Sequence, residues 1–429
     1  MKRKRPTLAA AGIALFACTL HAQTARAADA EVVYEWNQIL QNTLPAATAA
    51  FQGPRLYAMM HIAIFDAVNA IERDYSPYRV MVKASSGASQ EAAAAQAAHD
   101  VVWALIPTAE ARAILDAALA ARLATMDPDR ARQGVAIGRA TAAEILAWRQ
   151  NDGSTDPPPP YTLPLIAGLW QRTPPGFLPA GATGFPGVDP FALLTSTQFL
   201  PRRFPELNSA EYAADFNEVK ALGLVNSLVR TPDQTQLALL FAGVITRTSN
   251  LALWQNVARD VARGRLLSLV DAARVFALLN ATFNDSLQTS HTSKFVYGLW
   301  RPVTAIEEAD EDLNPLTDPQ PGWLPLLITP PYPSHSSNMA CNGAGAARAL
   351  ANVFGTNDIA ITARWYDNTG NTGTPVATRN YAGFWEMALD QGRSRVYGGI
   401  HFTFELTASQ ESCAKVADYA FENYMTPAG

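Results

Sequence analysis

Apolar residues recur with helical spacing along most of the chain. In residues 55–72 they follow the i, i+3, i+4 pattern of one buried stripe, formed by Leu56, Met59, Met60, Ala63, Ile64 and Ala67. Alanine-rich segments with the same periodicity cover 90–106, 108–126 and 129–151, and a polar turn at 151–154 stops the last of them. Four helices joined by short links predict a helical bundle.

The pattern breaks in residues 156–205 and then resumes. Four consecutive prolines from Pro157 and scattered Pro and Gly leave little room for regular structure there, which predicts a long ordered connection. Residues around 359–365 look strand-like, but we expect no sheet from them. Further helices are predicted at 209–222, 232–262, 268–290, 339–354, 379–396 and 407–425.

These patterns predict a mainly α protein with two helical, four-helix-type bundles packed as one unit and long Pro/Gly-rich loops. The expected divisions are an N-terminal bundle over 28–155, the connection over 156–205 and a C-terminal bundle over 206–429. The polar clusters described below all fall in the C-terminal bundle.

The first 27 residues have the features of an export signal. Four basic residues at 2–5 precede an apolar stretch at 8–20, and Ala25-Arg26-Ala27 forms a small-x-small cleavage site. We therefore expect an exported protein, periplasmic or secreted. An alternative is lipoprotein processing at Cys18, although Phe16 is bulky for that signal.

Composition narrows the class of protein. The chain has 429 residues, 48% of them hydrophobic, which excludes a disordered or collagen-like protein. Cleavage after Ala27 removes five of the 33 basic residues and none of the 38 acidic ones, leaving 28 against 38 and a net charge of −10. This charge speaks against nucleic acid as a partner.

After the signal no apolar stretch reaches the roughly 18 residues of a transmembrane segment. Two cysteines remain after cleavage, Cys341 and Cys413, and they either pair or stay free. Nothing indicates an oligomeric state.

The first polar cluster is Lys294 to Pro302. Lys294 and Arg301 are seven residues apart, so on a helix they lie on nearly the same side and converge on one anion. The plainer interpretation is two solvated charges near a helix end.

Two more clusters follow. In the second, a Pro-rich segment with several hydroxyls and His335 runs into a small-residue helix that begins near Met339; the helix N-terminus favours an anion, or one Ser simply caps it. In the third, Gly398-Gly399 ends a helix and brings His401 beside the guanidinium of Arg395, unless His401 is an ordinary core residue. Together the three clusters supply two Arg, a Lys, hydroxyls and a His, which is a complete oxyanion pocket.

In this order, Lys-x6-Arg-Pro, a Ser-rich Pro-Ser element and Ser-Arg-x5-His resemble the three-part signature of the vanadium-dependent haloperoxidases and the type 2 phosphatidic acid phosphatase superfamily. Lys294, Arg301 and Pro302 match the first part, and Ser394, Arg395 and His401 match the third. Residues 61–71 and 395–402 are also similar to bacterial secreted members of the haloperoxidase type. The resemblance implies a mainly helical fold with two four-helix bundles.

The resemblance also implies roles. Lys294, Arg301 and Arg395 would hold the equatorial oxygens of vanadate, or of phosphate in the same site. His401 would be the axial vanadium ligand of a peroxidase or the phosphohistidine-forming nucleophile of a phosphatase. Main-chain N–H groups at Ser337 and Asn338 would bind the oxyanion.

The middle part of the signature departs from the usual Pro-Ser-Gly-His. A gap-free alignment puts Ser337 at the Ser, Asn338 at the Gly and Met339 at the acid/base His, and Met339 transfers no proton. A shifted alignment instead uses Ser334 and His335, at the cost of a deletion. We favour the gap-free version, because it keeps the small residues of the following helix in phase, with His335 able to swing in from upstream.

The leading hypothesis is an exported vanadate-dependent haloperoxidase that uses hydrogen peroxide to oxidise a halide, with Lys294 polarising the peroxide. The first alternative is a secreted acid phosphatase acting on phosphomonoesters through the same pocket. The second is a non-catalytic phosphate- or vanadate-binding protein that has lost its acid/base His.

Overall fold

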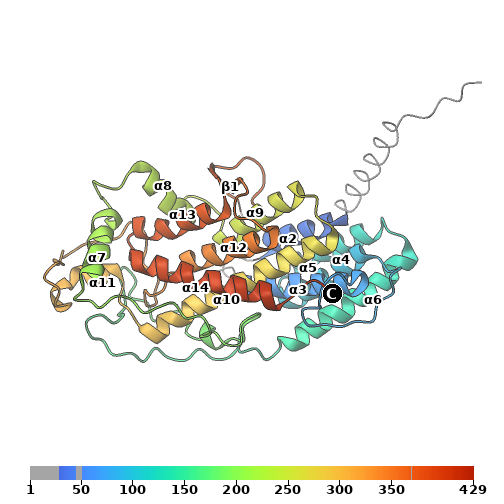
Figure 1. Cartoon of the computed structure of the whole chain (residues 1–429), viewed down its shortest axis with the longest axis horizontal. Coiled ribbons are helices and arrows are strands. Elements are labelled where there is room, and N and C mark those ends of the chain that lie inside the picture. The colour runs from blue at the N-terminus through green and yellow to red at the C-terminus, as the bar shows by residue number, and fades with distance from the viewer. Residues whose placement is uncertain (1–28, 45–50, 369) are drawn as a thin grey trace, which may run out of the picture.

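The computed structural model describes residues 29–44, 51–368 and 370–429, so the expected signal at 1–27 lies outside the described residues. The chain is mainly helical, as the periodicity predicts, and its helices form an elongated body (Figure 1). The helices of the N-terminal part are α2 (Glu31–Thr43), α3 (Gln52–Glu72), α4 (Gln90–Leu105), α5 (Ala109–Leu123) and α6 (Pro128–Trp148). Helix α2 was not predicted from the sequence.

Helix α10 (Leu269–Tyr297) runs through the centre and joins the two ends of the molecule. It is buried along nearly its whole length, and it packs against α3 on one side and against α12 (Asn338–Phe354) and α14 (Thr403–Asn423) on the other. A helix with almost no exposed face needs neighbours all round, which explains why both groups of helices share it. Helices of the two groups therefore form one continuous core.

The remaining helices complete the C-terminal end: α7 (Ala210–Gly223), α8 (Pro232–Phe241), α9 (Asn250–Gly264), α11 (Pro302–Glu307) and α13 (Phe384–Tyr397), with a 3-10 turn η3 (Ala309–Glu311). A disulfide between Cys341 and Cys413 joins α12 to α14. Their Cα atoms are 5.3 Å apart, within the usual range for a disulfide.

Two local predictions are wrong. The segment 232–262 is not one helix, because the β-branched run from Val244 is irregular and Ser249 caps a new helix by accepting a hydrogen bond from the Ala252 N–H. The strand-like residues do form a sheet: β1 (Ile361–Trp365) pairs antiparallel with β2 (Ala377–Tyr381). The helix predicted at 379–396 consequently begins only at Phe384.

The Pro/Gly-rich connection runs from the end of α6 along the lower left edge of Figure 1 towards α7. Within 156–205, all of which is described, the only helix or strand is the 3-10 turn η2 (Phe185–Gly187). Asp285 of α10 anchors the segment: its carboxylate accepts hydrogen bonds from the backbone N–H groups of Phe191, Ala192 and Leu193 at 2.8, 2.6 and 3.0 Å. A buried carboxylate with three donors fixes an otherwise irregular chain.

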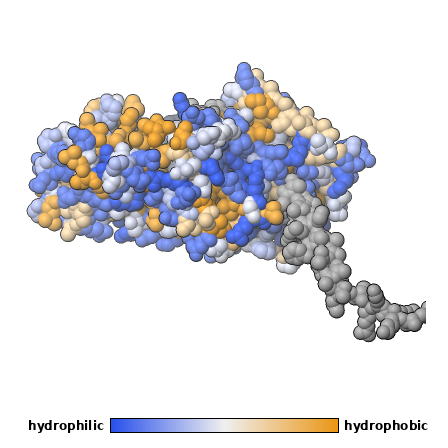
Figure 2. All heavy atoms as spheres, turned by 90° about the horizontal axis from the view of Figure 1, so that it is seen from above, coloured by the Kyte–Doolittle hydropathy of each residue, from blue (hydrophilic) through white to orange (hydrophobic). Residues whose placement is uncertain are grey.

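The surface is mostly polar, with separate apolar patches on the face that Figure 2 shows. Among the described residues no helix is long and apolar enough to cross a membrane.

Candidate active site

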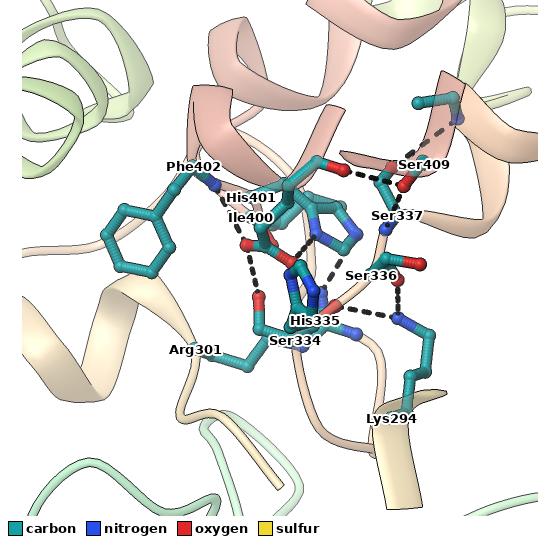
Figure 3. A network of polar contacts seen from close by, with 12 residues as sticks. Lys294, Arg301, Ser334, His335, Ser336, Ser337, Ile400, His401, Phe402 and Ser409 are labelled. Atoms are coloured by element: carbon teal, nitrogen blue, oxygen red, sulfur yellow. Dashed lines mark hydrogen bonds and ion pairs between the residues drawn. The ribbon is translucent and has the colours of Figure 1, made fainter. Parts of the chain in front are cut away.

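The three polar clusters meet where α10 ends and α14 begins (Figure 3). Helix α10 ends at Tyr297, and Gly298 takes a left-handed backbone with φ 66°. Lys294 and Arg301 therefore do not lie on one helix, as the sequence suggested; Arg301 is the extended residue before α11. Gly permits this turn because it has no Cβ, and the turn brings Arg301 back towards the end of α10.

Lys294 is fully buried and holds the loop before α12. Its ammonium donates to the backbone oxygens of Ser334, at 2.7 Å, and Ser336. Burial lowers the pKa of Lys294 well below its usual value; the charges of Arg301 and Arg395 add to this, and Glu405 opposes it. The Lys294 side chain thus shapes the loop that carries the middle motif.

Arg301 and Arg395 each have buried N–H groups without a hydrogen-bond acceptor among the described residues. Arg301 donates from Nε to the Tyr332 oxygen at 2.9 Å and from Nη1 to the Ile400 oxygen at 2.8 Å. Its buried Nη2 has no partner among the described residues, and neither do the buried Nε and Nη1 of Arg395. Burial lowers the pKa of Arg395 to about 10, which is still high enough to keep it charged at neutral pH. Three buried donors on two cations thus remain for a ligand.

His401 lies beside Arg301, with Nε2 3.2 Å from Arg301 Nη1. The sequence suggested Arg395 as its neighbour; in the structure Arg395 acts on His401 through its charge, which lowers the pKa of the imidazole further. Gly398-Gly399 does end α13, and a Cβ on Gly399, where φ is 76°, would lie 2.5 Å from the Gly223 oxygen. Only glycine allows this approach, and it sets the path to His401.

The sequence interpretation missed Glu405, which orients His401. The fully buried Glu405 accepts hydrogen bonds from His401 Nδ1 at 2.9 Å, Ser334 Oγ at 2.7 Å and the Phe402 N–H at 2.9 Å. Burial raises the pKa of Glu405 to about 7, and the charge of Lys294 opposes the shift. A glutamate four residues after a candidate His, at a helix start, is the signal that could have revealed it.

Burial, together with the charges of Arg301, Lys294 and Arg395, holds the pKa of His401 well below its usual value. The imidazole is therefore neutral at physiological pH. Because Nδ1–H donates to Glu405, Nε2 keeps its lone pair and faces Arg301. This is the tautomer that a metal ligand or a nucleophile requires.

The residues of the middle motif lie in two different surroundings. The fully buried His335 contacts the Arg202 backbone oxygen through Nε2 at 2.8 Å, and its ring packs among Phe204, Tyr297 and Phe404. Burial lowers the pKa of His335 to about 3. Met339, in contrast, lines a cavity together with Arg395.

Ser337 and Asn338 are used within the protein. Ser337 caps α12 with its side chain, and its backbone N–H donates to Ser409 Oγ at 2.9 Å. Asn338 Oδ1 accepts from Ser290 Oγ at 2.9 Å. A further residue that the sequence interpretation did not single out, His291, lies 3.4 Å from Asn338 through Nδ1, and its buried Nε2 has no partner among the described residues.

The comparisons with known proteins identify the C-terminal domain and the fold. Residues 274–428 match the family model described as the VCPO second helical-bundle domain, and they include Lys294, Arg301, Arg395, His401 and Glu405. The C-terminal part of the chain, residues 274–428, therefore carries a helical-bundle domain of the vanadium haloperoxidase type. The sequence-based recognition of the superfamily is thereby confirmed. No curated protein matches the chain.

Solved members of this superfamily have the same fold. The crystal structure of a bacterial vanadium-dependent iodoperoxidase superposes with a TM-score of 0.74 at 20% identity, over 96% of this chain and 97% of that one. Two bacterial vanadium-dependent chloroperoxidase structures also superpose. The holo form has a TM-score of 0.68 at 15% identity, over 89% of this chain and 94% of its own. The apo form has 0.65 at 16% identity, over 86% and 92%.

Proposed function

We propose that this chain is an exported, vanadate-dependent haloperoxidase that uses hydrogen peroxide to oxidise a halide. The observation that carries the proposal is the set of three buried N–H groups without partners, on Arg301 and Arg395, next to the lone pair of His401. A buried donor without an acceptor costs about 1–3 kcal/mol, and more on a charged group. An oxyanion between the two guanidinium groups would remove that cost and balance their charge.

Vanadate fits this donor set. Arg301 and Arg395 would hold its oxygens with their free N–H groups, and His401 Nε2 would be its protein ligand. Glu405 keeps the Nδ1 proton in place, so that Nε2 remains available. Lys294 would act mainly through the loop it holds, because its ammonium already donates to two backbone oxygens. When bound, vanadate supplies the activation of the peroxide for the overall conversion of peroxide, halide and a proton to hypohalous acid and water.

The same donor set would also hold phosphate, but the cavity beside Arg395 argues against a phosphatase. A phosphomonoester needs a group that protonates the departing alkoxide. The described lining of that cavity contains Met339 and no His, Asp or Glu. This arrangement supports the gap-free alignment, in which Met339 stands at the acid/base position.

The test is a pair of assays on the purified protein. Protein loaded with vanadate is expected to brominate or iodinate phenol red in the presence of peroxide and halide, whereas vanadate-free protein is expected to leave 4-nitrophenyl phosphate intact. Arg393→Ala serves as a matched control for Arg395→Ala. Arg393 lies on α13 as Arg395 does, but it pairs with Glu218 at 2.7 Å. Release of 4-nitrophenol without vanadate, and no halogenation with it, would favour the phosphatase. Export would be tested by sequencing the mature N-terminus, expected after Ala27.

A further inference from the structure

The cavity beside Arg395 has a volume of about 440 Å³, and the function proposed so far assigns no ligand to it. Both groups of helices build its wall. Gln41 of α2, Tyr57 of α3 and Phe283 of α10 meet Met339 of α12 and Arg395 of α13 there. Its rim is the 242–249 segment between α8 and α9, where Gly243 and Arg247 are exposed. The volume is that of a pocket for a small organic ligand.

Two amides in the wall present free N–H groups in a fixed orientation. Thr248 Oγ1 accepts from the Tyr366 N–H at 2.9 Å, so its own proton goes to Asn371 Oδ1. The Asn371 oxygen is thereby committed, and its buried Nδ2 has no partner among the described residues. Asn371 therefore offers a donor to the cavity.

Gln41 repeats this arrangement. Its Oε1 lies 3.4 Å from Arg259, a group that only donates, and its buried Nε2 has no partner in the described part of the chain. The buried hydroxyl of Thr246 is likewise without a partner. Buried polar atoms are nearly always satisfied, so these atoms indicate a ligand that brings acceptor oxygens.

Charge and shape narrow the ligand further. The described lining holds two arginines, Arg247 and Arg395, and no carboxylate. Its apolar part includes three aromatic rings, of Tyr57, Phe241 and Phe283. Aromatic walls favour a flat ring, and a donor-rich, positively charged lining favours an oxygen that carries negative charge.

We propose that this cavity binds a phenolic ring, with its oxygen on the free amides of Gln41 and Asn371, and presents the ring to the oxyanion site at Arg395. The reaction that this serves rests on the proposed function. Hypohalous acid would transfer its halogen to a ring carbon: the C–X bond forms with electrons of the ring, and the X–O bond breaks with its pair going to oxygen. The ring proton then leaves and completes a water molecule.

The first measurement compares two probes by titration calorimetry at a pH where 4-nitrophenol is ionised. 4-Nitrophenolate is expected to bind with saturation, and 4-nitroaniline, which has the same shape but a donor in place of the oxygen, is expected to bind at least about tenfold more weakly. Saturating phosphate should leave the 4-nitrophenolate affinity nearly unchanged, because phosphate would occupy the oxyanion cradle. Equal affinity for both probes, or strict competition with phosphate, would overturn the proposal.

Variants then test the named donors. Asn371→Asp keeps the acceptor for Thr248 and tolerates the same left-handed backbone, at φ 49°, but replaces the free N–H group with a negative oxygen. It is expected to weaken 4-nitrophenolate binding roughly tenfold or more. Asn423→Asp adds the same charge at an exposed position of α14 and is expected to have no effect. Ala252→Phe, which fills the cavity from α9, should block the probe as well and covers the case in which Asn371→Asp fails to fold.

The outcomes separate this inference from the proposed function. Phosphate binding without 4-nitrophenolate binding would overturn the phenol site and leave the oxyanion site standing. 4-Nitrophenolate binding that responds to Asn371→Asp, in a protein that does not halogenate, would support the phenol site and overturn the peroxidase. Unchanged binding in both Asn371→Asp and Ala252→Phe would overturn the phenol site.

Discussion

Two of the buried polar clusters in the described part of the chain differ in what their arginines contact. In the cluster between α2 and α9, Arg259 donates through its two terminal nitrogens to the side-chain oxygens of Asn37 and Asn256. His61 completes it, with Nε2 2.8 Å from Asn37 Nδ2. In the candidate active site, Arg301 and Arg395 keep three buried N–H groups without partners among the described residues.

Burial alone does not distinguish the two clusters. It lowers the pKa of Arg259 and of Arg395 alike to about 10. It also lowers the pKa of His61 to about 3, as it does for His335. The two clusters differ in their hydrogen-bond acceptors. Neutral amide oxygens accept hydrogen bonds from Arg259, whereas the cations around His401 outnumber the one carboxylate, Glu405. A buried arginine therefore indicates an anion site when its N–H groups exceed the acceptors around it.

The largest expected effect is that of His401→Ala. Loss of the Nε2 that would hold vanadate is expected to reduce halide oxidation to background while the protein stays folded, because one side chain at a helix start contributes little to a core of this size. The matched variant His61→Ala should do the opposite: it should lower the melting temperature and leave turnover nearly intact. Turnover and circular dichroism melts measure both. Full activity in His401→Ala would show that His401 does not hold the cofactor.

Restoring the usual acid/base residue should raise activity. Met339 lines the cavity at Arg395. Met339→His combined with Asn338→Gly is therefore expected to increase turnover by about 10²-fold, the contribution of a positioned general acid or base. Steady-state rates with bromide and peroxide provide the measurement, and Met339→Leu with Asn338→Gly is the control without an imidazole. An equal response in both double variants would show that the imidazole has no effect.

Anion affinity should separate the two arginines. Arg395→Ala is expected to weaken vanadate or phosphate binding by about 1.5–3 kcal/mol, the usual size of a lost hydrogen bond to a charged group. Arg259→Ala should leave this affinity unchanged but destabilise the fold by about 1–3 kcal/mol, because buried amide oxygens lose their donor. Calorimetry measures the anion affinity, and denaturant unfolding measures the free energy of unfolding. Similar losses of affinity in both variants would erase the contrast between the clusters.

The sequence predicts the helices well where a strong apolar period continues between clear caps. The segment predicted at 90–106 is α4 (Gln90–Leu105), with Ser89 as its cap. Between α8 and α9 the prediction failed, because Val244 and Ile245 keep apolar residues in place across a non-helical segment. The β1–β2 hairpin was missed because pairing with 377–381 is a long-range property that helical periodicity in 379–396 conceals.

The sequence identified which residues form the candidate site but not how they contact one another. Spacing singled out Lys294, Arg301, Arg395 and His401, and their roles toward vanadate stay predictions. Their arrangement depends on the turn at Gly298, which takes Arg301 off the helix of Lys294. The contact of Glu405 with His401 depends on α14 beginning at Thr403, two residues after the histidine, and periodicity does not resolve a helix start to that precision.

The smallest expected effect concerns His335, for which the sequence left two alignments open. In the structure its ring lies among Phe204, Tyr297 and Phe404, away from the described lining of the Arg395 cavity. His335→Ala is therefore expected to change turnover less than about twofold and to show its effect in stability, as the loss of a packed core side chain does. Rates normalised to folded protein distinguish the two effects. If His335→Ala instead silences the enzyme, and Met339→His with Asn338→Gly does nothing, then the shifted alignment is right, and Ser334 and His335 hold the roles assigned here to Ser337 and Met339.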